Sequence, residues 1–488
     1  IGTSHFKIFF QSQCAKIAEQ YCFLIVTLAL SITITMKHIF LILFFNLTLG
    51  MLFAQKGSIQ GRIFEEASNT ALPFSNIYID GTAIGATSDF DGNFLITGID
   101  PGIYRLTAQS LGYATSYTEE IRVSPGKTAN ISIAMKPQAV QLKEVEVKAN
   151  IFRKVEEAPV SLRSIGVGEI ENNPGANRDI SKVIQTLPGV AAFPGQNRND
   201  IIVRGGASNE SRFFLDDVEI PNINHFATQG ASGGTNGIIN ADFIREVDFY
   251  SGAFPANKGN ALSGVFNFRQ IDGNKDALRF RGSLGASELA LSLDGPLGEK
   301  TTYLISVRRS YLQFLFKFIG LPFLPTFNDM QFKVKTRIDD KNEISFIGLG
   351  SYDANVLDTD IANPDEFQRY LLGNLPESNQ WTYALGAVYK HYRENGFQTL
   401  VLSRNMLFNR SYKYFNNVVD DAGLISDFNS FEAENKLRLE NFTQTGNGFR
   451  INYGVNAEYV KYNNNTFRKV FRQDMADTLA YESTLSFF

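Results

Sequence analysis

From residue 271 onward the chain alternates between apolar and polar positions in short runs. Such runs include Leu278–Arg281, Leu289–Asp294, Phe332–Ile338 and Trp381–Tyr389. Segments of about ten residues that are apolar on one face and polar on the other are typical of a transmembrane antiparallel β-barrel. We therefore expect Phe332 and Val334 to face lipid, and the cations Lys333, Lys335 and Arg337 to face the lumen.

Alternation also occurs in soluble sandwiches, so the barrel prediction depends on the lengths of the connections. Short connections are expected at Asp294–Glu299, Asp339–Asn342, Arg393–Gly396 and Thr443–Gly448. Long ones lie between them, at Tyr311–Asn328, Asp353–Asn379, Leu407–Asn429 and Asn463–Ala476. Short periplasmic turns that alternate with long extracellular loops are typical of outer-membrane barrels. Residues 271–488 hold about ten such strands, whereas a barrel that encloses a domain has about 22. We therefore expect a partial barrel, and a chain that is a piece of a longer protein.

Two further patterns precede the barrel. In residues 55–136, short apolar runs are separated by the turn dipeptides Asp80-Gly81, Asp91-Gly92, Pro101-Gly102 and Pro125-Gly126, which predict a β-sandwich of about seven strands. Residues 137–150 form a linker. Residues 151–270 mix helix and strand signals, with a short helix expected over Asp179–Thr186, capped near Asn177. The predicted fold class is mainly β: an N-terminal β-sandwich, an α+β domain and the first part of a transmembrane antiparallel β-barrel.

The start of the chain predicts a secretory signal peptide over residues 36–54. Met36 is followed by the basic Lys37, an apolar run over Ile39–Phe53 and the small residue Ala54, so that Gln55 would begin the mature protein. Residues 1–35 would then be an upstream extension that is not native. The alternative is a transmembrane helix lengthened by the apolar run at Phe23–Ile34, but polar residues and a glycine interrupt residues 39–53.

Composition excludes several classes of function. The chain has 46 basic and 50 acidic residues, so it lacks the positive excess that nucleic-acid binding requires. A hydrophobic content of 44% is too high for a disordered chain. The only cysteines, Cys14 and Cys22, precede the predicted cleavage site, and the mature chain keeps only His225 and His391. We find no Walker A motif, Ser–His–Asp set, dinucleotide fingerprint or metal-ligand cluster, and we expect no enzyme activity, metal or cofactor.

The predicted sandwich resembles the carboxypeptidase-regulatory-like domain. The resemblance lies in Gly61-Arg62-Ile63, in Asp91-Gly92 followed by Phe94, and in Tyr104-Arg105-Leu106. It implies a fold and not a peptidase, because a zinc carboxypeptidase binds its metal with two histidines and a glutamate.

Residues 151–270 resemble the plug domain of TonB-dependent outer-membrane receptors. The resemblance follows, in order, the helix, Leu187-Pro188-Gly189-Val190, a strand into Arg204-Gly205-Gly206, the acidic hairpin turn Asp216-Asp217, and a last strand from Gly264. Asp217 stands where the family usually has glycine, and aspartate tolerates the left-handed conformation that this position requires.

The linker contains a segment that resembles a TonB box: Glu144, Val145, Glu146, Val147, Lys148 and Ala149. Its two valines alternate with charged residues, as in a strand that adds to the sheet edge of another protein. The alternative is a last strand of the sandwich or a solvated linker.

These resemblances imply a receptor that binds an extracellular nutrient and imports it into the periplasm, driven by the inner-membrane TonB complex. Its expected partners are that complex, the lipids of the outer membrane of a Gram-negative bacterium, and a small-molecule or oligomeric ligand. The alternative is a passive pore or surface adhesin with a sandwich appendage. Receptors that pair with a surface lipoprotein usually carry a different sequence at Glu246–Pro255, so a lipoprotein lid is not favoured.

Two plug residues allow two interpretations each. The resemblance makes the Arg204 loop a candidate plug–barrel contact, although a role in satisfying backbone carbonyls near the glycine turn is favoured. His225 lies in a loop and could line a ligand site, but a lone loop histidine is more often solvated.

Overall fold

The structure is a computed structural model that describes residues 55–138, 161–173, 179–192, 198–231, 233–285, 287–420, 422–445, 449–471 and 476–487. The signal peptide, the extension before it and the TonB-box-like segment Glu144–Ala149 lie outside these residues, as does Ala54 on one side of the predicted cleavage site. None of the helices in the described part of the chain is long and apolar enough to cross a membrane.

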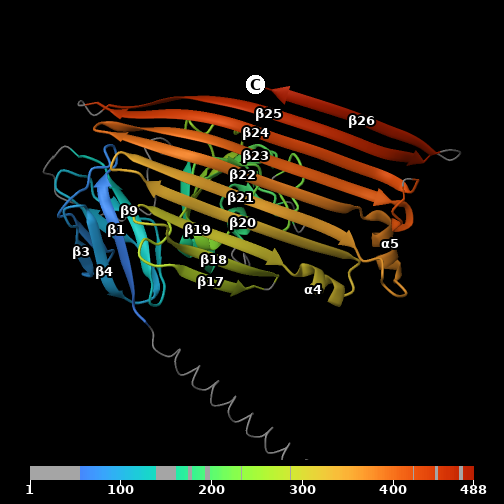
Figure 1. The fold of residues 1–488 in the computed structure, drawn as a ribbon, viewed down its shortest axis with the longest axis horizontal. Coiled ribbons are helices and arrows are strands. Elements are labelled where there is room, and N and C mark those ends of the chain that lie inside the picture. The colour runs from blue at the N-terminus through green and yellow to red at the C-terminus, as the bar shows by residue number, and fades with distance from the viewer. Residues whose placement is uncertain are drawn as a thin grey trace, which may run out of the picture. The chain divides into compact units, whose positions relative to one another are not determined.

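The first described region is a small β-sandwich with nine strands instead of about seven (Figure 1). The strands are β1 (Gly57–Glu65), β2 (Asn76–Ile79), β3 (Gly85–Thr87), β4 (Asn93–Ile99), β5 (Gly102–Tyr104), β6 (Leu106–Gln109), β7 (Ser116–Tyr117), β8 (Ile121–Val123) and β9 (Thr128–Met135). They form sheets in the orders β4-β1-β9, β3-β2-β6-β7 and β5-β8. Alternate side chains of these strands, such as Ile59, Ile63 and Ile133, are buried in a shared apolar core.

The second region, which we call the plug, is a mixed α+β domain. Its elements are β10 (Leu162–Gly166), α2 (Val167–Asn172), α3 (Ile180–Gln185), β11 (Val190–Ala191), β12 (Ile202–Val203), β13 (Ser211–Leu215), β14 (Val218–Ile220), η1 (Ala241–Phe243), β15 (Ile244–Tyr250) and β16 (Gly264–Gln270). Five strands form one sheet in the order β10-β15-β16-β13-β14. The predicted helix is present as α3, and its N-cap is Asp179, two residues after Asn177: the Asp179 carboxylate accepts a hydrogen bond from the Ser181 amide at 2.9 Å.

The third region is a ten-stranded antiparallel sheet whose strands lie side by side in chain order. They are β17 (Arg279–Leu284), β18 (Glu288–Pro296), β19 (Thr301–Ser310), β20 (Phe323–Arg337), β21 (Asn342–Leu357), β22 (Glu377–Arg393), β23 (Gly396–Tyr414), β24 (Leu424–Gln444), β25 (Arg450–Phe471) and β26 (Ala476–Phe487). Three short helices lie in its longer connections: α4 (Leu312–Phe318), α5 (Glu366–Asn374) and η2 (Phe415–Asn417).

Several strands extend further than the sequence pattern suggested. β20 begins at Phe323, inside the predicted loop Tyr311–Asn328, and β23 continues to Tyr414. β25 runs to Phe471, so the loop predicted over Asn463–Ala476 is wrong over most of its length. The extensions of β23 and β25 are rich in asparagine and basic residues, which hide the apolar alternation on which the prediction depended. Backbone pairing to the neighbouring strand holds them in register all the same.

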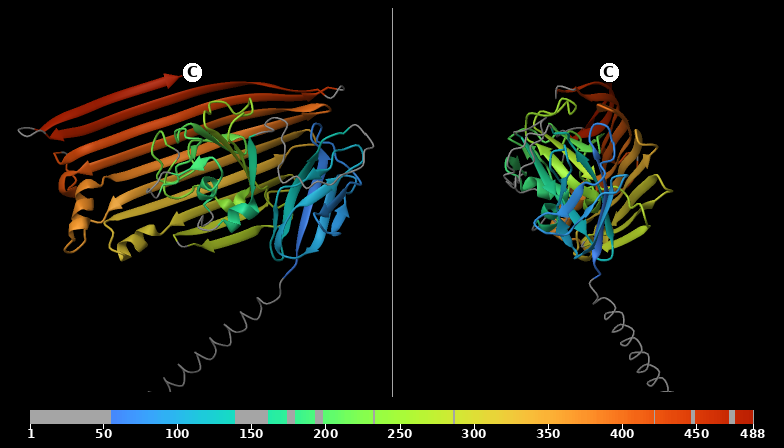
Figure 2. Two further views of the ribbon diagram at one scale, coloured as in Figure 1. Left: turned by 180° about the vertical axis from the view of Figure 1, so that it is seen from behind. Right: turned by 90° about the vertical axis from the view of Figure 1, so that its left-hand side faces the viewer.

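The sheet curves, and the plug lies against its concave face (Figure 2). One apolar core joins the two: buried plug residues such as Phe266 and Phe268 share it with Ile347, Leu349, Ala384, Val388 and Val401 of the sheet. On the other face of the sheet, large apolar side chains such as Leu437 and Leu439 are exposed. One face of the sheet therefore suits lipid, while the other holds the plug.

Candidate functional site at the plug–sheet interface

The acidic hairpin of the plug turns at Asp216 and Asp217, both in the left-handed region with φ of 45° and 74°. Positive φ at both central residues is the geometry that joins tightly twisted antiparallel strands, and it usually selects Asn or Gly. Aspartate therefore occupies the glycine place, as the sequence predicted. The carboxylate of Asp216 accepts the Gln270 amide at 2.9 Å, which ties the turn to the end of β16.

The other motif residues of the plug lie at the opposite end of the same strands. β13 and β16 are parallel, with Ser211 beside Gly264 and Leu215 beside Phe268. The Arg204-Gly205-Gly206 turn packs at the Gly264 end, because a Cβ on Gly206 would meet the Ser263 side chain. The motif residues predicted from the sequence thus form two separate groups and not one site.

Arg204 forms hydrogen bonds to two other residues of the plug. Its amide donates to the Gly189 carbonyl at 2.8 Å, and its guanidinium donates to the Ser251 hydroxyl at 3.0 Å. These contacts agree with the structural interpretation of this residue, since both partners belong to the plug itself.

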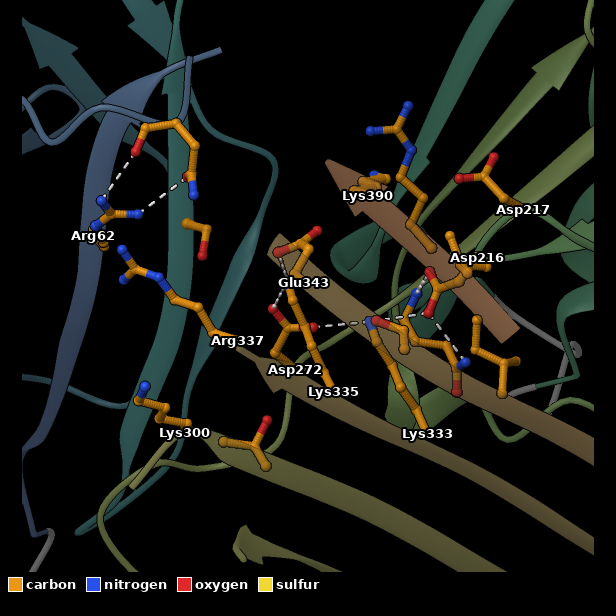
Figure 3. A pocket seen from close by; sticks show the side chains of 18 of the residues that line it. Arg62, Asp216, Asp217, Asp272, Lys300, Lys333, Lys335, Arg337, Glu343 and Lys390 are labelled. Atoms are coloured by element: carbon orange, nitrogen blue, oxygen red, sulfur yellow. Dashed lines mark hydrogen bonds and ion pairs between the residues drawn. The ribbon is translucent and has the colours of Figure 1, made fainter. Parts of the chain in front are cut away.

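A cluster of ion pairs joins the acidic hairpin to β20 (Figure 3). Lys333 contacts Asp216 at 2.9 Å and Asp272 at 2.8 Å, and Lys335 contacts Asp272 at 3.1 Å. Burial alone would raise the pKa of Asp272, but the two ammonium groups outweigh it and hold that pKa well below its usual value. Lys333 and Lys335 therefore face the plug, as expected from the alternation of β20.

A second set of contacts runs along β24, whose alternate residues Glu432, Glu434, Lys436, Arg438 and Glu440 point to the plug side. Lys436 pairs with Glu219 of the plug, and Arg438 lies 3.6 Å from Asp217. Gln229 donates to Glu432 at 3.2 Å, and Asn257 donates to Glu440 at 3.1 Å. One strand, β24, therefore contacts the hairpin and two further plug loops.

Asp217 also pairs within the plug, with Lys258 at 3.0 Å. Burial would raise the pKa of Asp217, but Lys258 and more distant cations outweigh it and lower that pKa. The aspartate that replaces glycine in the turn is therefore an ionised partner of both plug and sheet.

His225 is fully buried, so the expectation of a solvated loop histidine is wrong. Its Nδ1 lies 2.7 Å from Asp353 and its Nε2 lies 3.0 Å from Asp329. The ring stacks on Phe327 at 4.1 Å between centroids. Sequence reasoning missed this contact because the two aspartates stand 128 and 104 residues away, on β21 and β20.

Plug and sheet approach each other closely at Gly386 of β22. A Cβ on this glycine would lie 2.3 Å from a methyl group of Val218 in the plug hairpin. The absence of a side chain at Gly386 therefore lets the hairpin contact the wall of the sheet.

No group of three or more His, Cys, Asp or Glu residues with metal-binding geometry occurs among the described residues. The two nitrogens of His225 point to different carboxylates on opposite ring edges, which is a hydrogen-bonding arrangement and not a ligand set.

Comparisons with known families identify two domains. Residues 59–147 match the CarboxypepD_reg-like domain, and residues 154–265 match the TonB-dependent receptor plug domain. The first match extends into the TonB-box-like segment, so both interpretations of residues 144–147 stay open.

Two curated relatives are also similar. Over 164 residues the chain is 30% identical to TonB-dependent receptor P3 of Formosa agariphila. The aligned region covers 32% of this chain and 15% of that relative. Over 264 residues it is 20% identical to the TonB-dependent transporter Oar of Myxococcus xanthus. This aligned region covers 50% of this chain and 23% of that relative. The chain thus spans less than a quarter of the length of either relative.

Solved structures similar to this chain include a mutant of the ferric enterobactin receptor of Pseudomonas aeruginosa, with a TM-score of 0.47 and 16% identity over 64% of this chain and 50% of that one. The siderophore receptor PirA of Acinetobacter baumannii has a TM-score of 0.46 and 16% identity, over 63% of this chain and 48% of that one.

The plug domain match and the relatives confirm the class that the sequence predicted, together with its location in the outer membrane and its mainly β fold with a partial barrel. The chain therefore carries a TonB-dependent receptor plug domain at residues 154–265, preceded by a CarboxypepD_reg-like domain at residues 59–147, and is similar to TonB-dependent receptors.

Proposed function

We propose that the protein is a receptor that binds an extracellular nutrient and imports it into the periplasm, with energy from the inner-membrane TonB complex. The observation that carries this proposal is the seating of the plug: a domain buried against the inner face of the sheet by an apolar core and by ion pairs to β20 and β24. A plug held in this way blocks free diffusion, so passage of a ligand requires work on the plug.

The work would be applied through the segment Glu144–Ala149, which precedes the plug in the chain. A segment in which valines alternate with charged residues can add as a strand to the sheet edge of a TonB-like partner in the periplasm. The sandwich before it would then also lie in the periplasm. We assign transport rather than catalysis, with outer-membrane lipid around the apolar face of the sheet; a surface lipoprotein partner is not favoured.

The test is a comparison of cells that carry the complete gene with cells that lack it. Both would be given a defined mixture of ferric siderophores, cobalamin, oligosaccharides and peptides, and depletion of each compound from the medium would be measured by mass spectrometry. We expect at least one compound to be depleted only by cells with the gene, and only while the proton gradient is intact. Depletion that continues after a protonophore is added would favour the passive pore instead.

A further inference from the structure

The environment of His225 determines its protonation state. Each ring nitrogen faces a carboxylate, Asp353 at 2.7 Å and Asp329 at 3.0 Å, and an ionised carboxylate can only accept hydrogen bonds. Both nitrogens therefore carry a proton, and the ring is an imidazolium ion. Asp353 also accepts the Phe226 amide at 2.7 Å, so its second oxygen holds the backbone of the same loop.

The proton on His225 supplies one of the two positive charges that face Asp329 and Asp353. Asp329 is also bound by Arg308 of β19, at 2.9 and 3.0 Å, and Arg308 donates to the carbonyls of Gly237 and Ile238 in the plug. Two carboxylates thus face two cations in a site where His225, Asp329 and Asp353 are all buried. Glu288 of β18, 3.5 Å from Arg308, and Asp179 of the plug are the other acids near this group. Loss of the proton would leave an uncompensated negative charge in a buried site, which is costly.

We propose that His225, as an imidazolium ion, is a latch that fixes the plug loop Asn222–Ala227 to strands β19–β21, and that loss of its proton releases this loop. The latch is a property of the resting protein. Only its role in import, as a contact that must open before the plug moves, rests on the proposed function.

The direction of the pH effect follows from the two states of the loop. Burial alone would lower the pKa of His225, but Asp353 and Asp329 outweigh it and raise that pKa to about 9. A histidine in water has a pKa of about 6.5. Protonation therefore favours the docked loop: this stabilisation is complete below about pH 6.5 and is lost as the pH rises through about 9.

The experiment measures exposure of the loop directly. Ala227 is 3% exposed and lies next to the latch, so Ala227→Cys would react with a maleimide only when the loop lifts. Leu262, which is 80% exposed, gives a second reporter, Leu262→Cys, whose rate corrects for the pH dependence of the thiol. The full-length protein would be used in isolated outer membranes, without an energy source.

We expect the corrected rate at Cys introduced in place of Ala227 to rise about 100-fold between pH 6 and pH 10. In the His225→Gln background it should be high at every pH. His391→Gln is the matched control, because His391 lies on β22 and contacts Asn342 of the sheet, and it should behave like the parent. If His225→Gln fails to assemble, Asp353→Asn tests the latch instead. In this variant the corrected maleimide rate should begin to rise at a lower pH.

A corrected rate that is independent of pH in the parent would overturn the latch, as would equal rates in the parent and His225→Gln. Neither result bears on energised import, which is measured separately by depletion of nutrients. Failure of the latch and failure of the proposed function are therefore distinguishable.

Discussion

Gly386 sets how closely the plug hairpin can approach the wall of the sheet. A Cβ there would lie 2.3 and 3.0 Å from the two methyl groups of Val218. Contacts this short force either the hairpin or β22 to shift, and overpacking of this kind costs about 1–3 kcal/mol.

We therefore predict that Gly386→Ala destabilises the seated plug by about 1–3 kcal/mol, and that Val218→Ala in the same chain recovers most of the loss. Thermal unfolding of the purified full-length protein would measure both. Gly350→Ala on β21 is the matched control, because a Cβ there meets its nearest atoms at 3.5 Å, an ordinary contact. An unfolding temperature as low in Gly350→Ala as in Gly386→Ala would show that the strands, and not the hairpin contact, are sensitive.

At single residues, sequence reasoning succeeded where the cause is local. The left-handed Asp217 followed from its place in a two-residue turn, and the orientation of Lys333 followed from alternation along one strand. It failed for His225, whose partners Asp329 and Asp353 lie on strands that the sequence could not bring together in space. The sequence marked His225 only by the rarity of histidine: His225 and His391 are the two histidines after the predicted cleavage site.

The two faces of strand β20 have different surroundings: one contacts the plug and the other is exposed. Gln331 is fully buried and donates to Gln270 of the plug at 2.8 Å, while its neighbour Met330, in the middle of the strand, is 41% exposed on the other face. The outer position suits lipid, where a cation near the bilayer midplane costs about 2–4 kcal/mol.

We predict that Met330→Arg sharply reduces the amount of assembled protein in the outer membrane, whereas Met330→Leu does not. Val334→Arg should have a smaller effect because Val334 lies nearer the end of β20, and Lys335→Val should be tolerated, since Lys333 remains paired with Asp272. Heat-modifiable mobility in gels measures assembly. Equal assembly of Met330→Arg and Met330→Leu would place this face of β20 away from lipid.

The extents of the long strands could be predicted only in part. Alternation of apolar residues identified their central portions, where one side faces lipid. Beyond that band both faces are polar, as in Asn463, Asn464 and Asn465 of β25, so hydrophobic periodicity disappears while the backbone ladder continues.

The segment before the plug provides a separate prediction. If Glu144–Ala149 pairs with a partner's sheet, Val147→Pro should abolish energised depletion of the nutrient while binding at the cell surface persists, because proline removes a backbone donor and fixes φ. Ala139→Pro, which lies in the linker before the segment, should have little effect. Unchanged import by Val147→Pro would mean that the segment is only a linker or the last strand of the sandwich.

For the whole molecule, the three sets of contacts act on different parts of one domain. Lys333 and Lys335 pair with the acidic hairpin and the end of β16, and β24 contacts the hairpin and neighbouring loops. His225 binds the loop Asn222–Ala227 to the sheet. Because these contacts link separate plug segments to separate strands, the plug need not leave the sheet as one rigid body. One plug segment can leave its strand while the ion pairs of the other segments stay formed.

The central claim is that the plug must move for import to occur, and a reversible cross-link tests it most directly. A Cβ on Gly386 would lie 3.2 Å from the Val218 Cβ, close to the roughly 3.5–4.5 Å of a disulfide. The cysteines of the sequence, Cys14 and Cys22, both precede the predicted cleavage site, so Val218→Cys with Gly386→Cys would introduce the bridge without a competing thiol in residues 55–488. We predict that oxidised cells bind the nutrient but do not deplete it, and that a reducing agent restores depletion. Depletion at the parent rate while the bridge is intact would contradict the account.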